Sequence, residues 1–319
     1  MTDSVADEIR VIAPSCSKRP KGRKLSYARA QKRLEALGYT VSFGGSIAKV
    51  FHLDTARAED RAADFNAAIA DANVKAVLAM HGGWAANDIL PLIDWQLVKD
   101  NPKPLIGYSD ITVLLNAVYA KTGCPAFLGP NFDTLGRRQL WQYGLENLDR
   151  MLRQDLPYSP RKSRFWMTRG DKRLHRAKPW QVLQAGQAEG VLVGGNLGTF
   201  YLLQGTPYQP RFDQPFILLA EDDDEAGKFT AREFARRLES ILQLPGVRQN
   251  LRGVIIGRFQ PSAKVRDKDL VAIIAAKHLG NIPVIARVDF GHTYPMLTLP
   301  IGGTAKLLAN ANNVEIALG

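Results

Sequence analysis

The fold is decided by the stretch Lys103-Pro-Leu-Ile-Gly-Tyr-Ser-Asp-Ile-Thr-Val-Leu-Leu-Asn-Ala-Val-Tyr119. The first residues, up to Tyr108, form a short apolar segment that is typical of a buried strand. From Ile111 to Tyr119 the apolar residues recur at helical spacing, so a helix follows at once. A strand that passes directly into a helix is the repeating unit of a parallel sheet covered by helices. Ser109 stands at the junction, at the sheet edge where such folds place their sites.

The sequence before this stretch repeats the same alternation. Strands are expected over residues 10–14, 40–43 and 74–80, and helices over residues 27–37 and 58–72. Gly38 directly follows the first of these helices, in the position that helix ends favour. The pattern therefore predicts an N-terminal α/β domain with a parallel sheet over residues 1–160.

The second half of the chain is richer in strands. Strands are expected over residues 189–194, 216–220, 253–257, 283–286, 296–299 and 314–316, with helices over 229–243 and 267–279. We expect a smaller C-terminal domain of mixed β/α structure over residues 189–319. Residues 161–188 are strongly basic and are expected to form a loop or linker between the two domains.

Composition and charge narrow the class of protein. The chain has 319 residues, 45% of them hydrophobic, which fits two globular domains. Its net charge of +11 fits an anionic ligand or nucleic acid. No apolar run reaches the about 18 residues of a membrane span. The acidic start Met1–Glu8 does not resemble a secretory signal, so a cytoplasmic protein is expected. Cys16 and Cys124 predict neither a disulfide framework nor a metal site.

Ser109 is a candidate nucleophile of an amide hydrolase. The helix that begins after it offers unpaired N–H groups and a partial positive charge, which suit an oxyanion. The backbone N–H of Asp110 is the first expected donor, and the turn Gly82-Gly83, after the strand 74–80, supplies a second. The segment is not a complete G-x-S-x-G motif. Ser109 or Asp110 could instead be a helix N-cap, and the glycines an ordinary turn.

Two further residues could complete a catalytic triad with Ser109. Glu221 ends an apolar strand and begins the acidic run Glu221–Glu225, whose later members are expected to face water. The run could also be a solvated face or a metal-binding loop. His292 follows a glycine in a loop after the strand 283–286, although a single loop histidine is often structural. Together the three residues fit a catalytic triad, with Ser109 as the nucleophile, Glu221 as the orienting carboxylate and His292 as the base.

Motifs along almost the whole chain resemble the LD-carboxypeptidase family of serine peptidases, which also contains the microcin C self-immunity proteins. The matching segments are Val11–Ser15, Gly82-Gly83, Leu90–Asp94, Asn101–Asp110, Gly190–Leu197, Ala220–Asp222, Gly253–Phe259 and Gly291-His292.

The resemblance implies that Ser109, Glu221 and His292 are the triad. It also implies an oxyanion hole from the backbone of Gly82, Gly83 and Asp110. A two-domain fold, a cytoplasmic homodimer and the absence of a metal or cofactor are implied as well.

The first glycine turn separates two subgroups of this family. Cell-wall LD-carboxypeptidases usually read Arg-Gly-Gly-Tyr-Gly there, whereas this chain reads His81-Gly-Gly-Trp-Ala85. The turn, with Asn87, is closer to the microcin C immunity subgroup, which cuts an amide between an aminoacyl group and a nucleotide-like group. His81, Trp84, Asn87, Trp166 and Trp180 are the candidate substrate-binding residues, since a basic loop with tryptophans suits an anionic aromatic group.

Two alternatives stay open at this point. The first is an LD-carboxypeptidase that trims murein tetrapeptides, and the choice between an L,D and an L,L bond is not decided. The second is a nucleotide or nucleic-acid binding module, suggested by the net charge and by the glycines of 194–198. No P-loop or G-x-G-x-x-G motif occurs, so a small peptide or aminoacyl-nucleotide is the expected partner rather than nucleic acid or a membrane.

Overall fold

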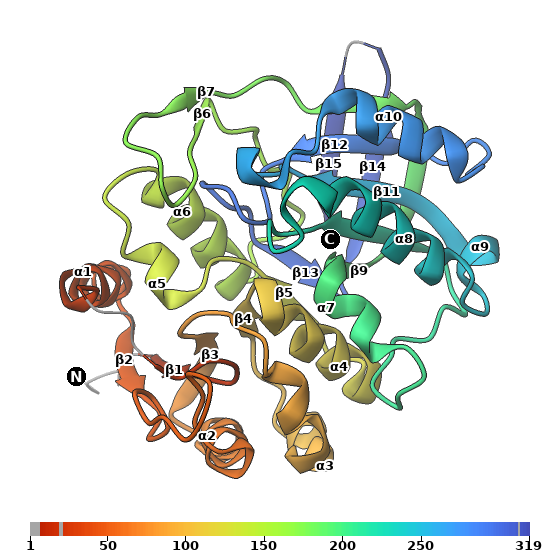
Figure 1. Ribbon diagram of the computed structural model, residues 1–319. Coiled ribbons are helices and arrows are strands. Elements are labelled where there is room, and N and C mark those ends of the chain that lie inside the picture. Colours follow the sequence, from red (N-terminus) through yellow and green to blue (C-terminus); the bar gives the residue numbers. More distant parts are fainter. Residues whose placement is uncertain (1–6, 19–21, 312) are drawn as a thin grey trace.

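The computed structural model describes residues 7–18, 22–311 and 313–319. Most of the acidic N-terminal start, residues 1–6, and residues 19–21 of the first basic run lie outside the described residues. In the described part the chain forms two sheets with helices packed around them (Figure 1). Among the described residues, no helix is both long and apolar enough to span a bilayer.

The first sheet has the strand order β13-β5-β4-β3-β1-β2 within the described residues. The first five strands in sequence run parallel to one another, and β13 runs antiparallel to β5. The central strands are buried almost throughout, which explains why they read as continuous apolar runs. The strands are β1 (Glu8–Ile12), β2 (Thr40–Phe43), β3 (Val74–Ala79), β4 (Leu105–Gly107), β5 (Ala126–Leu128) and β13 (Leu299–Ile301).

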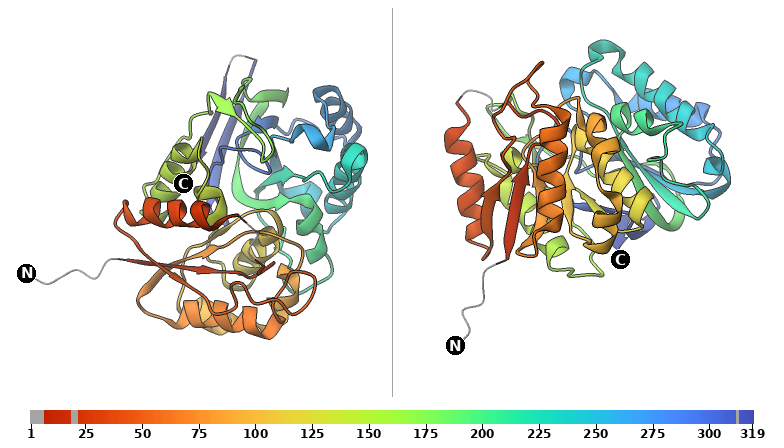
Figure 2. Two further views of the ribbon diagram at one scale, coloured as in Figure 1. Left: turned by 60° about the vertical axis from the view of Figure 1, so that its left-hand side comes forward. Right: turned by 90° about the horizontal axis from the view of Figure 1, so that it is seen from below.

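Helices cover both faces of this sheet (Figures 1 and 2). On one face lie α1 (Lys24–Glu35), α5 (Phe132–Leu135) and α6 (Trp141–Leu152), and on the other α2 (Ala58–Ala70), α3 (Trp95–Asp100) and α4 (Thr112–Thr122). The predicted parallel α/β fold of the N-terminal part is therefore confirmed.

The second sheet has the order β15-β14-β9-β10-β11-β12-β8 within the described residues. Strands β9 to β12 are parallel in its centre, and antiparallel strands flank them, so the C-terminal part is mixed as predicted. The strands are β8 (Gln181–Gln184), β9 (Gly186–Asn196), β10 (Phe216–Glu221), β11 (Leu251–Gly257), β12 (Val284–Val288), β14 (Thr304–Ala309) and β15 (Val314–Leu318). The helices are α7 (Leu197–Phe200), α8 (Thr230–Leu242), α9 (Val247–Asn250) and α10 (Asp267–Ala276).

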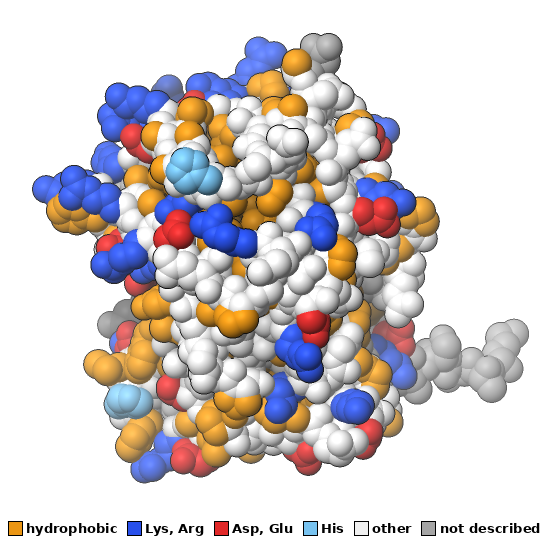
Figure 3. Space-filling view, turned by 90° about the vertical axis from the view of Figure 1, so that its right-hand side faces the viewer, with side chains coloured by type: hydrophobic (Ala, Val, Ile, Leu, Met, Phe, Trp, Pro, Cys, Tyr) orange, Lys and Arg blue, Asp and Glu red, His pale blue; other side chains and the backbone are white. Residues whose placement is uncertain are grey.

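The basic segment contains a small hairpin of β6 (Phe165–Trp166) and β7 (His175–Arg176). Lys and Arg side chains also gather at one upper edge of the face in Figure 3, while the rest of that face mixes basic, acidic and apolar groups. The surplus positive charge is therefore uneven over the surface, as the sequence indicated.

One of the expected strands lies elsewhere than predicted. A strand was expected over residues 296–299, but β13 begins at Leu299 and pairs with β5 of the first sheet. The residues before it are buried without joining a ladder, and Leu297 donates its N–H to the carbonyl of Asp289. The late part of the chain thus returns to the N-terminal sheet, while the division at residue 189 stays a prediction.

The two sheets meet where helix α4 packs against strand β9. The Asn116 side chain donates to the carbonyl of Gly194 at 3.0 Å and accepts from the N–H of Gly194 at 2.9 Å. A Cβ atom on Gly195 would come within 2.8 Å of the Thr112 hydroxyl, so the backbone approaches α4 closely there. This contact holds the carboxyl ends of β4 and β10 beside each other.

Candidate active site

Ser109 lies in a strained turn between strand β4 and helix α4. Its φ angle is +64°, in the left-handed region that residues other than glycine rarely adopt. The short helical turn Ser109–Ile111 then leads into α4. Strain of this kind concentrates at functional sites, and the turn exposes a serine at the end of a buried strand as the elbow of α/β-hydrolases does.

The glycine turn after β3 approaches Ser109 from one side. A Cβ atom on Gly82 would lie 2.9 Å from the Cβ and 3.0 Å from the Oγ of Ser109, and 3.5 Å from the amide nitrogen of Asp110. A Cβ on Gly83, which has φ of +153°, would meet the side chains of Ser15 and Cys16. The sequence therefore needs glycine at both positions to bring this backbone to the serine.

Three side chains expected to act together lie in hydrogen-bonding distance. The Nε2 atom of His292 is 3.0 Å from Ser109 Oγ, and the Nδ1 atom of His292 is 2.9 Å from an Oε atom of Glu221. Glu221 is buried at the end of β10, whereas 18% of the His292 side chain is exposed. A neutral histidine held in this way can take a proton from the serine hydroxyl.

Burial and the carboxylate of Glu221 act in opposite directions on the pKa of His292. Burial by itself lowers the pKa of His292, but the charge of Glu221 and its hydrogen bond, with smaller effects of Asp223 and Asp222, raise the pKa to about 9. Gly291, with φ of +100°, lets the chain pass over Glu221, since a Cβ there would lie 2.8 Å from an Oε atom.

The side chain of Asp110 fixes the loops around the serine. One carboxylate oxygen accepts hydrogen bonds from the Ser15 hydroxyl and, at 2.8 Å, from the N–H of Ala86. Burial raises the pKa of Asp110, against the lowering effect of these hydrogen bonds. The buried carboxylate thus joins the first strand's loop and the glycine turn to the start of α4.

The acidic run after Glu221 differs in part from its expected exposure. Asp222 is buried instead of facing water, and Arg237 of α8 donates to its two oxygens at 2.7 and 2.6 Å. Burial raises the pKa of Asp222 to about 7, although Arg237 opposes this shift. Glu225 is exposed, and a hydrogen bond from its N–H to Asp223 shapes the turn. Among the described residues, no three side chains of the metal-binding types cluster closely enough to hold a metal ion.

The candidates near the glycine turn have different surroundings. His81 is half-buried, and burial lowers the pKa of its imidazole. The charge of Asp133 raises this pKa, whereas the charges of Arg169 and Arg23 lower it further. Trp84 is 44% exposed and donates its indole N–H to the carbonyl of Leu53. Asn87 is exposed on the short helical segment after the turn.

Trp166 and Trp180 line two different cavities. Trp166 stacks on His175, with 4.6 Å between ring centroids, and lines a cavity of about 570 Å³ together with Gly257, Arg258 and Arg287. Trp180 is buried and donates its indole N–H to Asp289 at 3.0 Å.

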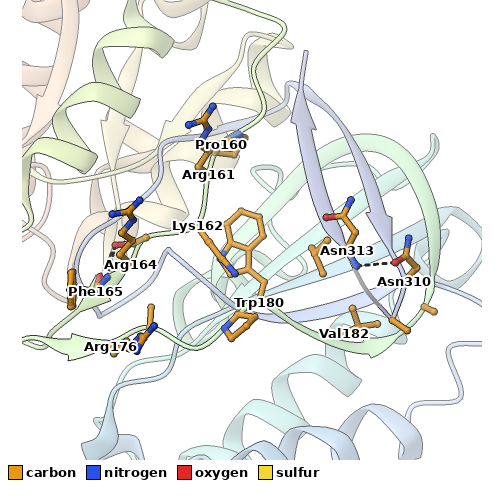
Figure 4. A pocket seen from close by; sticks show the side chains of 16 residues that line it. Pro160, Arg161, Lys162, Arg164, Phe165, Arg176, Trp180, Val182, Asn310 and Asn313 are labelled. Atoms are coloured by element: carbon orange, nitrogen blue, oxygen red, sulfur yellow. Dashed lines mark hydrogen bonds between the residues drawn. The ribbon is translucent and has the colours of Figure 1, made fainter.

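Trp180 lines a separate, open cavity of about 1570 Å³ between the basic segment and the turn of β14 and β15. Figure 4 shows it between Arg161 and Arg164 on one side and Asn310 and Asn313 on the other.

Sequence reasoning missed several residues around the triad. The ring of Tyr108 meets that of His292 edge-on at 5.5 Å, and Thr199 donates its hydroxyl to the carbonyl of Ser109 at 3.3 Å. Arg258 and Asp289 form a buried ion pair at 2.7 Å. The Gly-Gly-Asn-Leu motif pointed to the turn that holds Thr199, but nothing in the sequence pairs Arg258 with Asp289.

Comparison with known proteins places this geometry in a family. Residues 9–129 match the LD-carboxypeptidase N-terminal domain, and residues 189–307 match the LD-carboxypeptidase C-terminal domain. A protein of Treponema pallidum named "Putative carboxypeptidase" is 37% identical over 98% of this chain and 93% of its own length.

Two solved structures share the whole fold. An MccF-like protein from Bacillus anthracis has a TM-score of 0.92 at 33% identity, covering 98% of this chain and 96% of the other. MccF in complex with glutamyl sulfamoyl guanosine has a TM-score of 0.85 at 26% identity, covering 99% of this chain and 96% of the other. The chain therefore belongs to the LD-carboxypeptidase family of serine peptidases and is a carboxypeptidase-type amide hydrolase.

Proposed function

We propose that Ser109, His292 and Glu221 are the catalytic triad, and that the chain cleaves an amide between an aminoacyl group and a nucleotide-like leaving group. The observation that carries the first part is the continuous chain of contacts, 3.0 Å from Ser109 Oγ to His292 and 2.9 Å from His292 to Glu221. The second part rests on the cavity beside Trp166 and on the glutamyl sulfamoyl guanosine in the solved complex of MccF.

In this mechanism the Ser109 oxygen attacks the carbonyl carbon while its proton passes to Nε2 of His292. The N–H at Nδ1 donates to Glu221, which fixes the tautomer and stabilises the imidazolium. His292 then gives the proton to the leaving nitrogen, and an acyl-enzyme remains on Ser109. Water, activated by the same histidine, hydrolyses the ester and regenerates the serine.

The oxyanion of each tetrahedral intermediate needs donors on the side of the serine away from His292. The amide of Asp110 lies in the helical turn Ser109–Ile111, and the Gly82-Gly83 backbone lies against both Ser109 and Asp110. Backbone N–H groups in such a position stabilise the developing negative charge without reorganising. We therefore assign the oxyanion hole to Gly82, Gly83 and Asp110.

The cavity beside Trp166 suits an anionic aromatic leaving group. It begins at Gly257, where a Cβ atom would lie 2.9 Å from the Cβ of Glu221, so it adjoins the triad. Arg258 is 7% exposed and lies 5.7 Å from the ring of Trp166, and its Nη1 has no hydrogen-bond partner among the described residues. The aromatic base of a nucleotide-like leaving group could stack on Trp166, while the phosphate or sulfamoyl group of the same leaving group contacts Arg258 and Arg176.

Murein tetrapeptide trimming is the alternative within the same family. The two functions share the triad and differ in what leaves: an amino acid or a nucleotide-like group. His81 occupies the position at which the cell-wall enzymes usually carry arginine, which favours the aminoacyl-nucleotide substrate. A cytoplasmic homodimer is part of the proposal, on the strength of the family resemblance, and light scattering of the purified chain tests the dimer.

The experiment compares an aminoacyl sulfamoyl adenosine with an L,D-linked muropeptide on wild type, Ser109→Ala and Ser159→Ala. Ser159 is exposed and makes no contact with the triad, so Ser159→Ala is the matched control. We expect hydrolysis of the nucleotide analogue, a kcat about 10⁴-fold to 10⁶-fold lower in Ser109→Ala, and no change in the control. Normal hydrolysis by Ser109→Ala would overturn the triad.

Cleavage of the muropeptide alone would instead reject the nucleotide-like substrate and leave the triad standing. Salt-sensitive binding of nucleic acid without hydrolysis of either substrate would favour the binding-module alternative.

A further inference from the structure

A second, strongly basic cavity lies between helix α1, the connection from α5 to α6 and the hairpin of β6 and β7. Its volume is about 540 Å³. Its charged lining consists of five cationic side chains and one carboxylate, namely Arg23, Arg29, Arg137, Arg138, Lys172 and Asp171. None of these residues belongs to the proposed triad or to the cavity beside Trp166.

The carboxylate does not neutralise the cavity, because Asp171 already has partners. It accepts a hydrogen bond from the N–H of Thr168 at 2.6 Å and lies 3.1 Å from Nε2 of His175. In the described part of the chain, the side chains of Arg23, Arg138 and Lys172 form no ion pair or hydrogen bond.

Arg137, which lines this cavity, has one donor without a partner among the described residues. Its guanidinium stacks on the ring of Tyr294 at 3.6 Å, and one of its terminal nitrogens donates to the carbonyl of Thr168 at 3.2 Å. Its Nε is buried and has no acceptor among the described residues. A buried guanidinium N–H is costly without an acceptor, so this donor favours an acceptor in its surroundings.

The start of α1 adds to the positive potential. This helix of 12 residues begins after Arg23, with no side-chain cap and no acidic residue in its first turn. The positive end of the helix dipole therefore acts in the same direction as the arginines.

The cavity adjoins the active site through two residues. Tyr294, which carries the Arg137 stack, follows His292 by two positions and pairs through its backbone with Met167 of the cavity wall, at 2.9 and 2.8 Å. His81, directly before Gly82, is close enough to Arg23 for that charge to lower its pKa. An extended substrate bound at Ser109 could therefore reach the cavity.

We propose that this cavity is an oxyanion-binding subsite that takes a carboxylate or phosphate group of the substrate, remote from the scissile amide. The inference rests on the proposed function, because it places part of the substrate there. Arginine forks match the two oxygens of a carboxylate or phosphate, and both groups carry the charge that the five cations require.

The first experiment measures binding without turnover. Inorganic phosphate is titrated calorimetrically, at low ionic strength, into the full chain and two double variants. Arg138→Gln with Lys172→Gln removes two exposed charges from the cavity. Arg161→Gln with Arg164→Gln removes the same charge from the cavity at Trp180 and is the control. We expect about tenfold weaker phosphate binding in the first variant only.

The second experiment follows hydrolysis of two substrates that differ only in a remote group, a carboxylate or its carboxamide. The cavity variant should raise KM for the carboxylate substrate about tenfold relative to the carboxamide, and phosphate should compete more strongly with the carboxylate substrate than with the carboxamide. Equal effects of both double variants would overturn the subsite. Phosphate binding in the cavity without competition would identify a site for free anions and reject the substrate role.

The two proposals fail differently. If no substrate is hydrolysed but the cavity variant still loses phosphate binding, the proposed function fails and the anion site remains. If hydrolysis proceeds and the cavity variant behaves like the control in both experiments, the subsite is wrong and the function stands.

Discussion

Replacing Glu221 by Gln tests the part of the site that the electrostatics define most sharply. The substitution keeps the size of the side chain but removes the negative charge 2.9 Å from Nδ1 of His292. Burial lowers the pKa of His292, and the charge and hydrogen bond of Glu221, together with the charges of Asp223 and Asp222, outweigh it to give a pKa of about 9. Without that charge burial prevails, and we expect the pKa of His292 to fall to 6.5, its ordinary value, or lower.

The size of the effect follows from these two values. At 1.36 kcal/mol for each pKa unit, the net rise of the His292 pKa from 6.5 to about 9 corresponds to about 3 kcal/mol, and the attraction of the carboxylates exceeds this because it also offsets burial. Loss of the orienting carboxylate should also lower kcat by about 10³-fold to 10⁴-fold, as in other triads with the wrong tautomer. The buried, neutral amide that Glu221→Gln introduces cannot stabilise the charged histidine that forms during proton transfer.

The assay is the pH dependence of kcat/KM together with urea unfolding at each pH. The base must be neutral, so wild-type kcat/KM should rise with pH up to about 9, and that of Glu221→Gln should level off at pH 6.5 or lower. Because the folded pKa of His292 is raised, its stabilisation is complete below pH 6.5 and is lost as the pH rises to about 9. Over that interval wild type should lose about 3 kcal/mol of unfolding free energy relative to the variant.

Glu225→Gln is the matched control, since it removes an exposed charge from the same acidic run. It should leave the inflection of His292 near its wild-type position. The reasoning is refuted if Glu221→Gln keeps an inflection near pH 9 and a kcat within threefold of wild type.

Two further predictions concern packing around the site. Gly82→Ala should lower kcat about 100-fold, because the added methyl lies 3.0 Å or less from two Ser109 atoms. Gly170→Ala is the control, because its added methyl meets nothing within 4 Å, and it should leave kcat unchanged. Equal kcat values for the two variants would exclude this crowding. Arg237→Ala should reduce the free energy of unfolding by about 3 kcal/mol by leaving Asp222 buried without its partner. Adding Asp222→Asn should restore most of that stability, and no recovery in urea unfolding would reject the pairing argument.

Much of the fold could be read from local pattern. The apolar runs that became β3, β4 and β10 are buried on both faces, so their composition alone identified them. Ser109 was placed at the end of β4 because the helical spacing begins directly after it. The bounds of β2 were predicted at Thr40 and Phe43, as found.

The surroundings of single side chains could not be read in this way. Asp222 was expected in water, but a helix that begins eight residues later brings Arg237 to it. Trp166 and Trp180 were grouped by their basic neighbours, yet they line different cavities. Such contacts join residues far apart in the chain, and the local sequence carries no record of them.

The sequence by itself therefore determined the alternation of strands and helices, the strand ends that carry Ser109 and Glu221, and the family. Only the tertiary structure decided that β13 joins the first sheet, that Asp222 is buried, and that Arg137 stacks beside the His292 loop. The reason is physical: periodicity and turn preferences act over a few neighbouring residues, whereas strand exchange, buried ion pairs and cavities depend on which distant segments pack together.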